Sequence, residues 1–266
     1  MTSIQSLLLG VLQGVAEFLP ISSSGHLVLL RQLMKLGEVP LLYDVLLHVS
    51  TLIVVVIVFR RRIASIFSSI WKGVKSAAGP EDRENLRLTL YILIATLVTG
   101  VLGFVLSRFE ALFSNKPRLV CLLFLFTALF LLSTLLRRGQ RDYFQIGFLG
   151  AVIIGLAQGV GVLPGISRAG ITISVALLLG LDRERAGEFS FLIAIPAILG
   201  ALLLQLRDAG TLLETVDPVT LLVGFAAALV IGLISLKVLL RVVRKGQLAV
   251  FSIYLIPLAV VGLILL

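Results

Sequence analysis

The sequence predicts an all-α integral membrane protein with six transmembrane helices and two re-entrant helix hairpins in an inverted-topology repeat. Of its 266 residues, 59% are hydrophobic and 14% are charged, whereas a water-soluble protein carries roughly a quarter charged residues. Several uncharged stretches reach the length of about 18 residues that crosses a bilayer. Two further apolar regions are broken by Pro and Gly, and they are similar to each other.

The six spans follow from the hydrophobic stretches, and their directions follow from the basic residues beside them. We expect spans at Leu41–Phe59, Leu88–Ser107, Leu119–Leu136, Phe189–Leu206, Val219–Leu236 and Gln247–Leu266. Basic clusters follow the first, third and fifth spans, and short cytoplasmic loops are where Lys and Arg concentrate. We therefore expect these three spans to run inward and the acidic loop Asp208–Asp217 to lie outside.

The net charge of +9 does not indicate nucleic-acid binding, because the basic residues are clustered beside the spans. The clusters are Arg60, Arg61, Arg62, Lys72, Lys75, Arg83 and Arg87; Arg137, Arg138 and Arg141; and Lys237, Arg241, Arg244 and Lys245. Such clusters fix topology and contact anionic headgroups. We expect the bilayer as a partner and no nucleic acid. The single cysteine, Cys121, excludes a disulfide within the chain.

Two broken apolar regions, Met1–Leu30 and Phe144–Leu181, each predict a hairpin of short helices that dips into the bilayer. The breaks lie at Pro20 and Gly25 in the first region and at Pro164, Gly165 and Gly170 in the second. The predicted topology makes the first hairpin enter from outside and the second from inside. Backbone of this kind persists at membrane depth only where protein or a watery cavity surrounds it.

The two hairpins are copies of one motif. Residues Gly10–Gly25 and Gly155–Gly170 align with an offset of 145, and seven of the sixteen positions are identical. Each copy precedes three spans, so we predict one membrane domain over residues 1–266, with repeat 1 at about 1–140 and repeat 2 at about 141–266. Inverted repeats place binding sites near the bilayer midplane, at interrupted helices.

Each motif resembles an anion site, because small hydroxyl residues and Gly follow the Pro at a helix start. Free amide donors and the positive end of the helix dipole favour anions there. Arg168 adds a guanidinium, which binds phosphate oxygens in a bidentate manner. We expect phosphate or diphosphate as the anion. The candidate phosphate ligands at the helix starts are Ser22, Ser24, Gly25 and Gly170.

Three ionisable side chains inside the apolar regions are the candidate reactive groups: Glu17, His26 and Arg168. Charged residues at membrane depth are costly and are usually functional. Glu17 as a purely structural partner of Arg168, and His26 as a core histidine, are the alternatives, and the neighbouring serines favour function. At least one of the serines Ser22–Ser24 is expected to be an N-cap.

Four other side chains have less defined expectations. Asp44 and His48 lie one helical turn apart, and lining the same cavity and a structural role are equally consistent with that spacing. Trp71 and Tyr254 are expected to be lipid-facing or interfacial packing residues.

The residue types favour phosphoryl transfer by a small margin. A Ser or His nucleophile needs an adjacent base, and charge developing on phosphorus needs fixed positive donors. A transporter of an anion or a lipid could use nearly the same groups without a nucleophile. A scaffold role does not explain three buried ionisable groups in paired motifs.

The segments EFLPISSSGH (17–26) and PGISRAGIT (164–172) closely resemble the two signature motifs of the undecaprenyl-diphosphate phosphatase family of the bacitracin-resistance type. The segment EFSFLIAIP (188–196) is similar to a further family element, and the resemblance covers the whole chain. It implies hydrolysis of the C55 isoprenyl diphosphate to the monophosphate carrier lipid of cell-wall synthesis. It also implies the bacterial plasma (inner) membrane, with the site open toward the outer face. A flippase of the carrier lipid is the alternative function, and a homodimer is left open.

The resemblance also assigns roles to residues. It implies that Ser23 is the nucleophile and His26 its activating neighbour, with His26 as the attacking group left open. Glu17 matches the second acid of an (E/Q)xxxE motif, Arg168 matches a phosphate-clamping arginine, and Ser167 and Thr172 match further phosphate ligands.

The resemblance further implies a divalent cation, Mg²⁺ or Ca²⁺, held by Glu17 and Gln13. Many family members have Glu at the first motif position, where this chain has Gln13, so such a metal site has one carboxylate fewer. Ala169 stands where a serine is common, which leaves the serine, histidine and arginine of the motifs in place.

Overall fold

Helices form nearly all of the protein in a computed structural model, which describes residues 1–33, 41–109, 116–136, 139–205 and 216–266. The α-helices are α1 (Ser3–Ala16), α2 (Ser23–Leu33), α3 (Leu41–Val74), α4 (Arg83–Ser107), α6 (Pro117–Ser133), α7 (Tyr143–Val160), α8 (Arg168–Leu178), α9 (Arg183–Gln205), α11 (Pro218–Lys245) and α12 (Ser252–Leu265). Short 3₁₀ turns lie at Pro80–Asp82, Thr134–Leu136 and Leu248–Phe251. The expectations for Arg137, Arg138, Leu206 and Asp208 lie outside the described residues.

Seven helices in the described ranges are long and apolar enough to cross a membrane. Six of them, α3, α4, α6, α9, α11 and α12, correspond to the predicted spans. The seventh is α7, which we expected to be part of a re-entrant hairpin. Its 18 residues include Gly147 in a non-helical conformation with φ 64°. The uninterrupted helix at 148–160 is therefore about as short as the 14-residue α1.

Two helices continue past the ends that the basic clusters predicted. We expected spans to end at Phe59 and Leu236, but α3 runs to Val74 and α11 runs to Lys245. Lys and Arg are good helix formers, so leaving the apolar stretch does not end a helix. Instead, α11 ends where Gly246 adopts a left-handed conformation with φ 70°.

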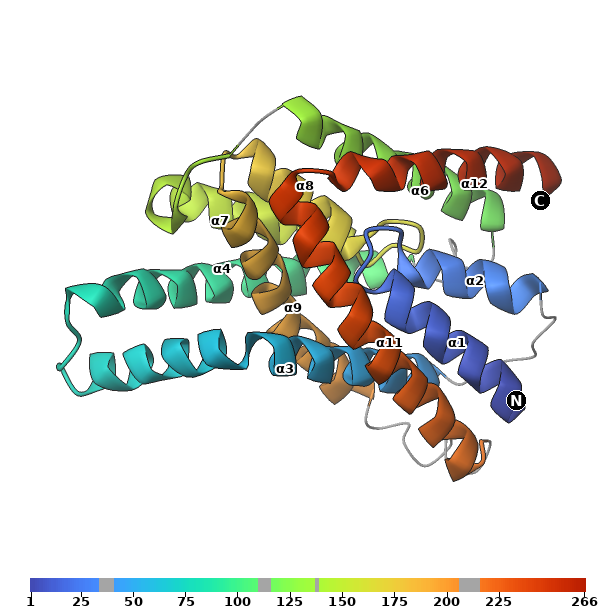
Figure 1. Ribbon diagram of the computed structural model, residues 1–266, viewed down its shortest axis with the longest axis horizontal. Coiled ribbons are helices and arrows are strands. Elements are labelled where there is room, and N and C mark those ends of the chain that lie inside the picture. Colours follow the sequence, from blue (N-terminus) through green and yellow to red (C-terminus); the bar gives the residue numbers. More distant parts are fainter. Residues whose placement is uncertain (34–40, 110–115, 137–138, 206–215) are drawn as a thin grey trace.

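Each of the two apolar regions with a predicted hairpin forms a pair of helices, α1–α2 and α7–α8, separated by turns at 17–22 and 161–167. They exchange partners between the two predicted repeats. Helix α1 packs most extensively on α11, and α7 packs on α4. Helices α6 and α12, the last of each repeat, lie side by side, and α11 crosses the middle of the molecule beside α1 (Figure 1). Neither repeat buries its own hairpin alone.

Glycines permit the closest of these contacts. A Cβ on Gly10 would collide with the backbone of Gly224 on α11. At Gly155, which aligns with Gly10, a Cβ would lie 2.7 Å from the carbonyl oxygen of Ala95 on α4. Because the obstructing atoms are backbone, they cannot turn aside as a side chain would.

We expect Gly10→Ala to lower the free energy of unfolding by about 1–3 kcal/mol through overpacking. Chemical or thermal unfolding in detergent measures this change. Gly100→Ala is the matched control, because no atom lies within 4 Å of a Cβ added there. It should be neutral, or stabilising by up to about 1 kcal/mol through helix propensity. Equal effects of the two substitutions would contradict the packing argument.

The turns of the two hairpins contact each other (Figure 1). The Ser22 hydroxyl oxygen accepts a hydrogen bond from the Gly165 amide at 3.1 Å. A Cβ on Gly25 would lie 2.9 Å from Gly165 Cα, which shows how closely the backbones approach. This contact brings the starts of α2 and α8 together.

Candidate active site

Serine caps shape the two helix starts. The Ser22 hydroxyl accepts a hydrogen bond from the Gly25 amide at 3.3 Å, and the Ser167 hydroxyl accepts one from the Gly170 amide at 3.1 Å. Ser22 itself has a φ of 71°, a left-handed conformation that is uncommon outside glycine. One of the three consecutive serines is therefore an N-cap, as expected.

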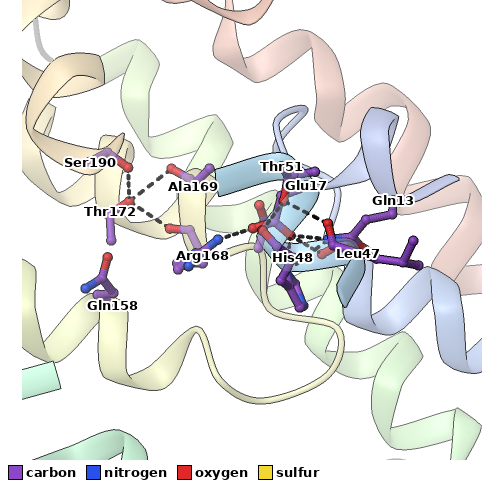
Figure 2. A network of polar contacts seen from close by, with 12 residues as sticks. Gln13, Glu17, Leu47, His48, Thr51, Gln158, Arg168, Ala169, Thr172 and Ser190 are labelled. Atoms are coloured by element: carbon purple, nitrogen blue, oxygen red, sulfur yellow. Dashed lines mark hydrogen bonds and ion pairs between the residues drawn. The ribbon is translucent and has the colours of Figure 1, made fainter. Parts of the chain in front are cut away.

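Glu17 is the centre of the polar contacts between the two hairpins (Figure 2). Its Oε1 accepts a hydrogen bond and forms an ion pair with the Arg168 guanidinium. Its Oε2 accepts hydrogen bonds from the Ser23 hydroxyl at 2.7 Å and the Gln13 amide at 3.2 Å. His48 Nδ1 lies 3.3 Å from the same oxygen. Glu17 is thus held between one cation on one side and a hydroxyl, an amide and an imidazole on the other.

The carboxylate is buried, which makes these contacts necessary. Glu17 is only 8% exposed, and a buried carboxylate is costly unless it is paired and hydrogen-bonded. Glu17 and Arg168 line a small pocket whose other polar groups come from Thr51 and Ser190. Its apolar wall consists of Phe18, Val55, Ala169, Phe191, Ala194 and Ile198. The pocket therefore joins the first hairpin to α3, α8 and α9.

His26 lies beside this cluster but does not contact the Ser23 hydroxyl or Glu17. Its Nδ1 is 2.8 Å from the Ser22 carbonyl oxygen, and its Nε2 is 2.8 Å from the Tyr254 hydroxyl. A carbonyl cannot donate, so Nδ1 carries the proton and Nε2 of a neutral ring accepts from Tyr254. The proton acceptor in contact with Ser23 is consequently Glu17. The imidazole beside Glu17 is that of His48.

Comparison with known proteins assigns the chain to a family. The family model described as "Bacitracin resistance protein BacA" matches residues 6–261. The chain belongs to the BacA family. It is 45% identical over 258 residues to the undecaprenyl-diphosphatase of Treponema denticola, which covers 97% of this chain and 95% of the relative.

Two other relatives are also named undecaprenyl-diphosphatase, like the Treponema denticola protein. The undecaprenyl-diphosphatase of Carboxydothermus hydrogenoformans is 41% identical over 270 residues, covering 100% of this chain and 98% of its own. That of Korarchaeum cryptofilum is 41% identical over 255 residues, covering 94% of each. The family resemblance stated from the two motifs is confirmed over nearly the whole chain.

Several of the predicted phosphate ligands already have hydrogen-bond partners within this BacA-family chain. The amides of Gly25 and Gly170 already have serine partners, and the Thr172 hydroxyl donates to the Arg168 carbonyl oxygen at 2.7 Å and contacts Ser190. These groups shape the turns before any ligand arrives. Phosphate binding by Ser22, Ser24, Gly25, Ser167, Gly170 and Thr172 stays a prediction.

Four amides at the helix starts are better placed to bind an anion. In the described part of the chain, no acceptor within the protein pairs with the amides of Ser23 and Ser24 at the start of α2 or of Arg168 and Ala169 at the start of α8. The first amides of any helix lack a partner within the helix. Because the two turns pack together, the two helix starts that carry these donors lie next to each other.

The residues for a divalent cation fit that ion in part. No group of three or more His, Cys, Asp or Glu suited to a metal occurs among the described residues. The Oε1 atom of Gln13, however, is buried without a hydrogen-bond partner, one helical turn before Glu17. One carboxylate and one free amide oxygen suit Mg²⁺, which binds few protein ligands and takes the rest from phosphate and water.

Sequence reasoning left two contributors, His48 and Tyr254, without a defined role, because their partners are distant in the chain. His48 is held at 3.0 Å by the Gln13 amide, while Asp44, considered together with it, pairs with Arg31 instead. Tyr254, expected to be a lipid-facing or interfacial packing residue, is 47% exposed, and its hydroxyl also contacts His26. The sequence signal that could have indicated a role for His48 is its position: it is an ionisable residue in the apolar span that follows the first copy of the repeat.

Thr127 on α6 is a further contributor that carries no motif signal. Its hydroxyl donates to the Gly165 carbonyl at 3.0 Å and accepts from the Ser167 amide at 3.1 Å. It is completely buried. It therefore fixes the turn that leads into Arg168.

We expect Thr127→Val to lower kcat by about 10- to 10²-fold, because a small displacement of a positioned group has an effect of this size. The valine keeps the shape but leaves two buried backbone groups without a partner. Thr127→Ser, which retains the hydroxyl, should restore most of the activity in a phosphate-release assay. Full activity in Thr127→Val together with loss of activity in Thr127→Ser would show that the methyl packing, and not the hydrogen bonds, matters.

Proposed function

We propose that this protein is an undecaprenyl-diphosphatase, which hydrolyses the C55 isoprenyl diphosphate to the monophosphate and phosphate. This reaction regenerates the carrier lipid of cell-wall synthesis. The observation that carries the proposal is the contact of one buried carboxylate, Glu17, with a serine hydroxyl on Oε2 and an arginine on Oε1. The names of the BacA-family relatives support the same activity.

Substrate binding begins at Arg168. The guanidinium presents five donors in a planar fork that matches phosphate oxygens, and it is paired with Glu17. The terminal phosphate takes the place of Glu17 Oε1 on Arg168, while the free amides of α2 and α8 donate to the remaining oxygens. Glu17 then loses its countercharge and becomes a stronger base toward Ser23.

Ser23 carries out the attack. Its Oγ forms a bond to the terminal phosphorus, its proton passes to Glu17 Oε2, and the bond between that phosphorus and the bridging oxygen breaks. The isoprenyl monophosphate leaves, and a phosphoserine remains. Glu17 gives its proton to the leaving monophosphate and then takes a proton from the water that attacks the phosphoserine. The bond between phosphorus and Ser23 Oγ breaks, Oγ regains the proton from Glu17, and phosphate is released. Both nitrogens of His26 have other partners, which favours Ser23 over His26 as the nucleophile.

A divalent cation, Mg²⁺ or Ca²⁺, would be held by Glu17 and the free oxygen of Gln13 together with the diphosphate. It would neutralise part of the diphosphate charge. Replacing Gln13 by Glu adds a carboxylate beside Glu17, so this variant should need less cation for half-maximal activity.

The membrane arrangement that suits this chemistry has six crossing helices, with the α1–α2 and α7–α8 hairpins inserted from opposite sides. The apolar α7 is interrupted at Gly147, and it has the same position in the second repeat as the short α1 has in the first. The site would open toward the outer face of the bacterial plasma membrane. Reaction of engineered cysteines beside the pocket with a membrane-impermeant thiol reagent, applied to whole cells, tests this orientation.

Phosphate release from farnesyl diphosphate or a longer homologue by purified protein in detergent tests the activity. No release across several cations and pH values would refute it. Transport of the carrier lipid is the alternative, but it gives no purpose to the Ser23–Glu17 hydrogen bond. Proteoliposomes containing Ser23→Ala would favour a transporter if they moved isoprenyl phosphate without releasing phosphate.

A further inference from the structure

The contact between His26 and Tyr254 has no part in the attack of Ser23. Tyr254 lies on α12, 228 residues away in the chain, and its hydroxyl is 2.8 Å from His26 Nε2. The two rings are stacked, with centroids 5.7 Å apart and an interplanar angle of 16°. Phe124 packs on the His26 ring at 5.0 Å. The imidazole is therefore held firmly, with its Nδ1 fixed by the Ser22 carbonyl oxygen.

This pair lies close to the proposed nucleophile. His26 follows Ser23 by three positions on α2, and residues with this spacing are neighbours on one helix face, about 5–6 Å apart at Cβ. The Tyr254 hydroxyl contacts the far nitrogen of the His26 ring, so one imidazole separates it from the start of α2. The internal phosphate of a diphosphate needs donors of its own, which Arg168 and Glu17 do not supply.

Tyr254 also lies at the lipid-facing surface. It is 47% exposed, and its neighbour Ile253 is 74% exposed, in a helix apolar enough to cross a membrane. Its hydroxyl points inward to the buried His26 while its ring borders the apolar surface. The internal phosphate of an isoprenyl diphosphate carries the hydrocarbon tail, so it must lie on the side of the site from which the tail can leave for the bilayer.

We propose that His26 and Tyr254 form the subsite for the internal phosphate, the one esterified to the isoprenoid. The proposal rests on the proposed function. On binding, the Tyr254 hydroxyl turns from His26 Nε2 to an oxygen of this phosphate, and the His26 ring stays in place through Ser22 and Phe124. Tyr254 is then a substrate-binding residue that selects alkyl diphosphates over phosphate groups without a lipid.

Inhibition by the two products separates the two subsites. Farnesyl monophosphate carries only the internal phosphate, and inorganic phosphate mimics the terminal one. With Tyr254→Phe, which keeps the stacked ring, we expect the inhibition constant of farnesyl monophosphate and the KM of farnesyl diphosphate to rise about 10-fold, as for one lost hydrogen bond to a charged group. The inhibition constant of inorganic phosphate and kcat should change less than about 2-fold.

Ile253→Ala, on the same helix, is the matched control and should leave both inhibition constants unchanged. Equal weakening of the two inhibitors in Tyr254→Phe would indicate a general structural effect and overturn the proposal. Unchanged inhibition by farnesyl monophosphate would overturn it as well. A wild-type protein that releases no phosphate would instead refute the proposed function, so the two failures are distinguishable.

Discussion

Replacing Ser23 by alanine is expected to lower kcat by at least about 10³-fold, because removal of a nucleophile is among the largest losses known for single substitutions. The Ser23 hydroxyl donates to Glu17 Oε2 at 2.7 Å, and no other hydroxyl in the described ranges contacts this carboxylate. Steady-state phosphate release from farnesyl diphosphate measures the loss. Acid quenching of wild-type turnover with terminally labelled substrate should also trap phosphate on Ser23.

Ser133→Ala is the control for this substitution. Its hydroxyl donates to the Phe130 carbonyl within α6, away from the site, so the variant should retain wild-type activity. If Ser23→Ala kept more than a tenth of the wild-type kcat, or if the label were found on His26, the assignment of the nucleophile would be wrong. The Glu17–Ser23 contact would then be structural.

The central groups of the site could be predicted because they lie in the two motifs. Glu17, Ser23 and Arg168 are polar or charged residues in apolar, broken segments, where only function or pairing accounts for their cost. The structure brings these three together through the contact between the two turns. The spans were predictable for a similar reason, since hydrophobic length is a strong signal.

The partners from other helices could not be predicted. Tyr254 reaches His26 from α12, and Thr127 reaches the second turn from α6. An aromatic or a threonine in an apolar helix carries no sign of its role, because such residues are also common where they only pack. The role of each follows from which helices of the two repeats contact each other. The internal repeat in the sequence does not determine these contacts.

The repeat also explains why two hairpins make one site. The offset of 145 places Gln158 at Gln13, Val162 at Glu17 and Ile193 at His48. Gln158 also contacts the residue at the aligned position, but through the backbone: its amide donates to the Ile193 carbonyl oxygen at 3.2 Å, whereas the Gln13 amide lies 3.0 Å from His48 Nδ1. The acid and the imidazole are absent from the second copy.

Arg168 takes the position that Ser23 has in the first copy. In the proposed mechanism, the first hairpin therefore supplies the acid and the nucleophile, and the second hairpin supplies the cation. Each half has kept the glycines and the serine cap that make the turn, while Glu17 and Ser23 differ from their counterparts Val162 and Arg168. The proposed reaction then requires both hairpins.

Replacing Arg168 by alanine should lower kcat/KM by about 10²–10³-fold, the usual effect of removing one donor that stabilises developing charge. Arg168→Lys keeps the charge but loses the planar fork, so its activity should be intermediate. The alanine variant should also unfold more easily, because Glu17 remains buried without its cation. The loss should be smaller than the about 3–5 kcal/mol found for fully buried pairs, since the Arg168 side chain is 24% exposed.

The double variant Arg168→Ala with Glu17→Gln separates catalysis from stability. Glutamine removes the orphaned charge and can still contact Ser23, so unfolding in detergent should return toward the wild-type value. Activity should stay at or below that of Arg168→Ala, because the phosphate clamp and the base are both missing. If the double variant regained activity together with stability, the ion pair would be a structural device. The reaction would then have to be carried by groups other than Glu17 and Arg168.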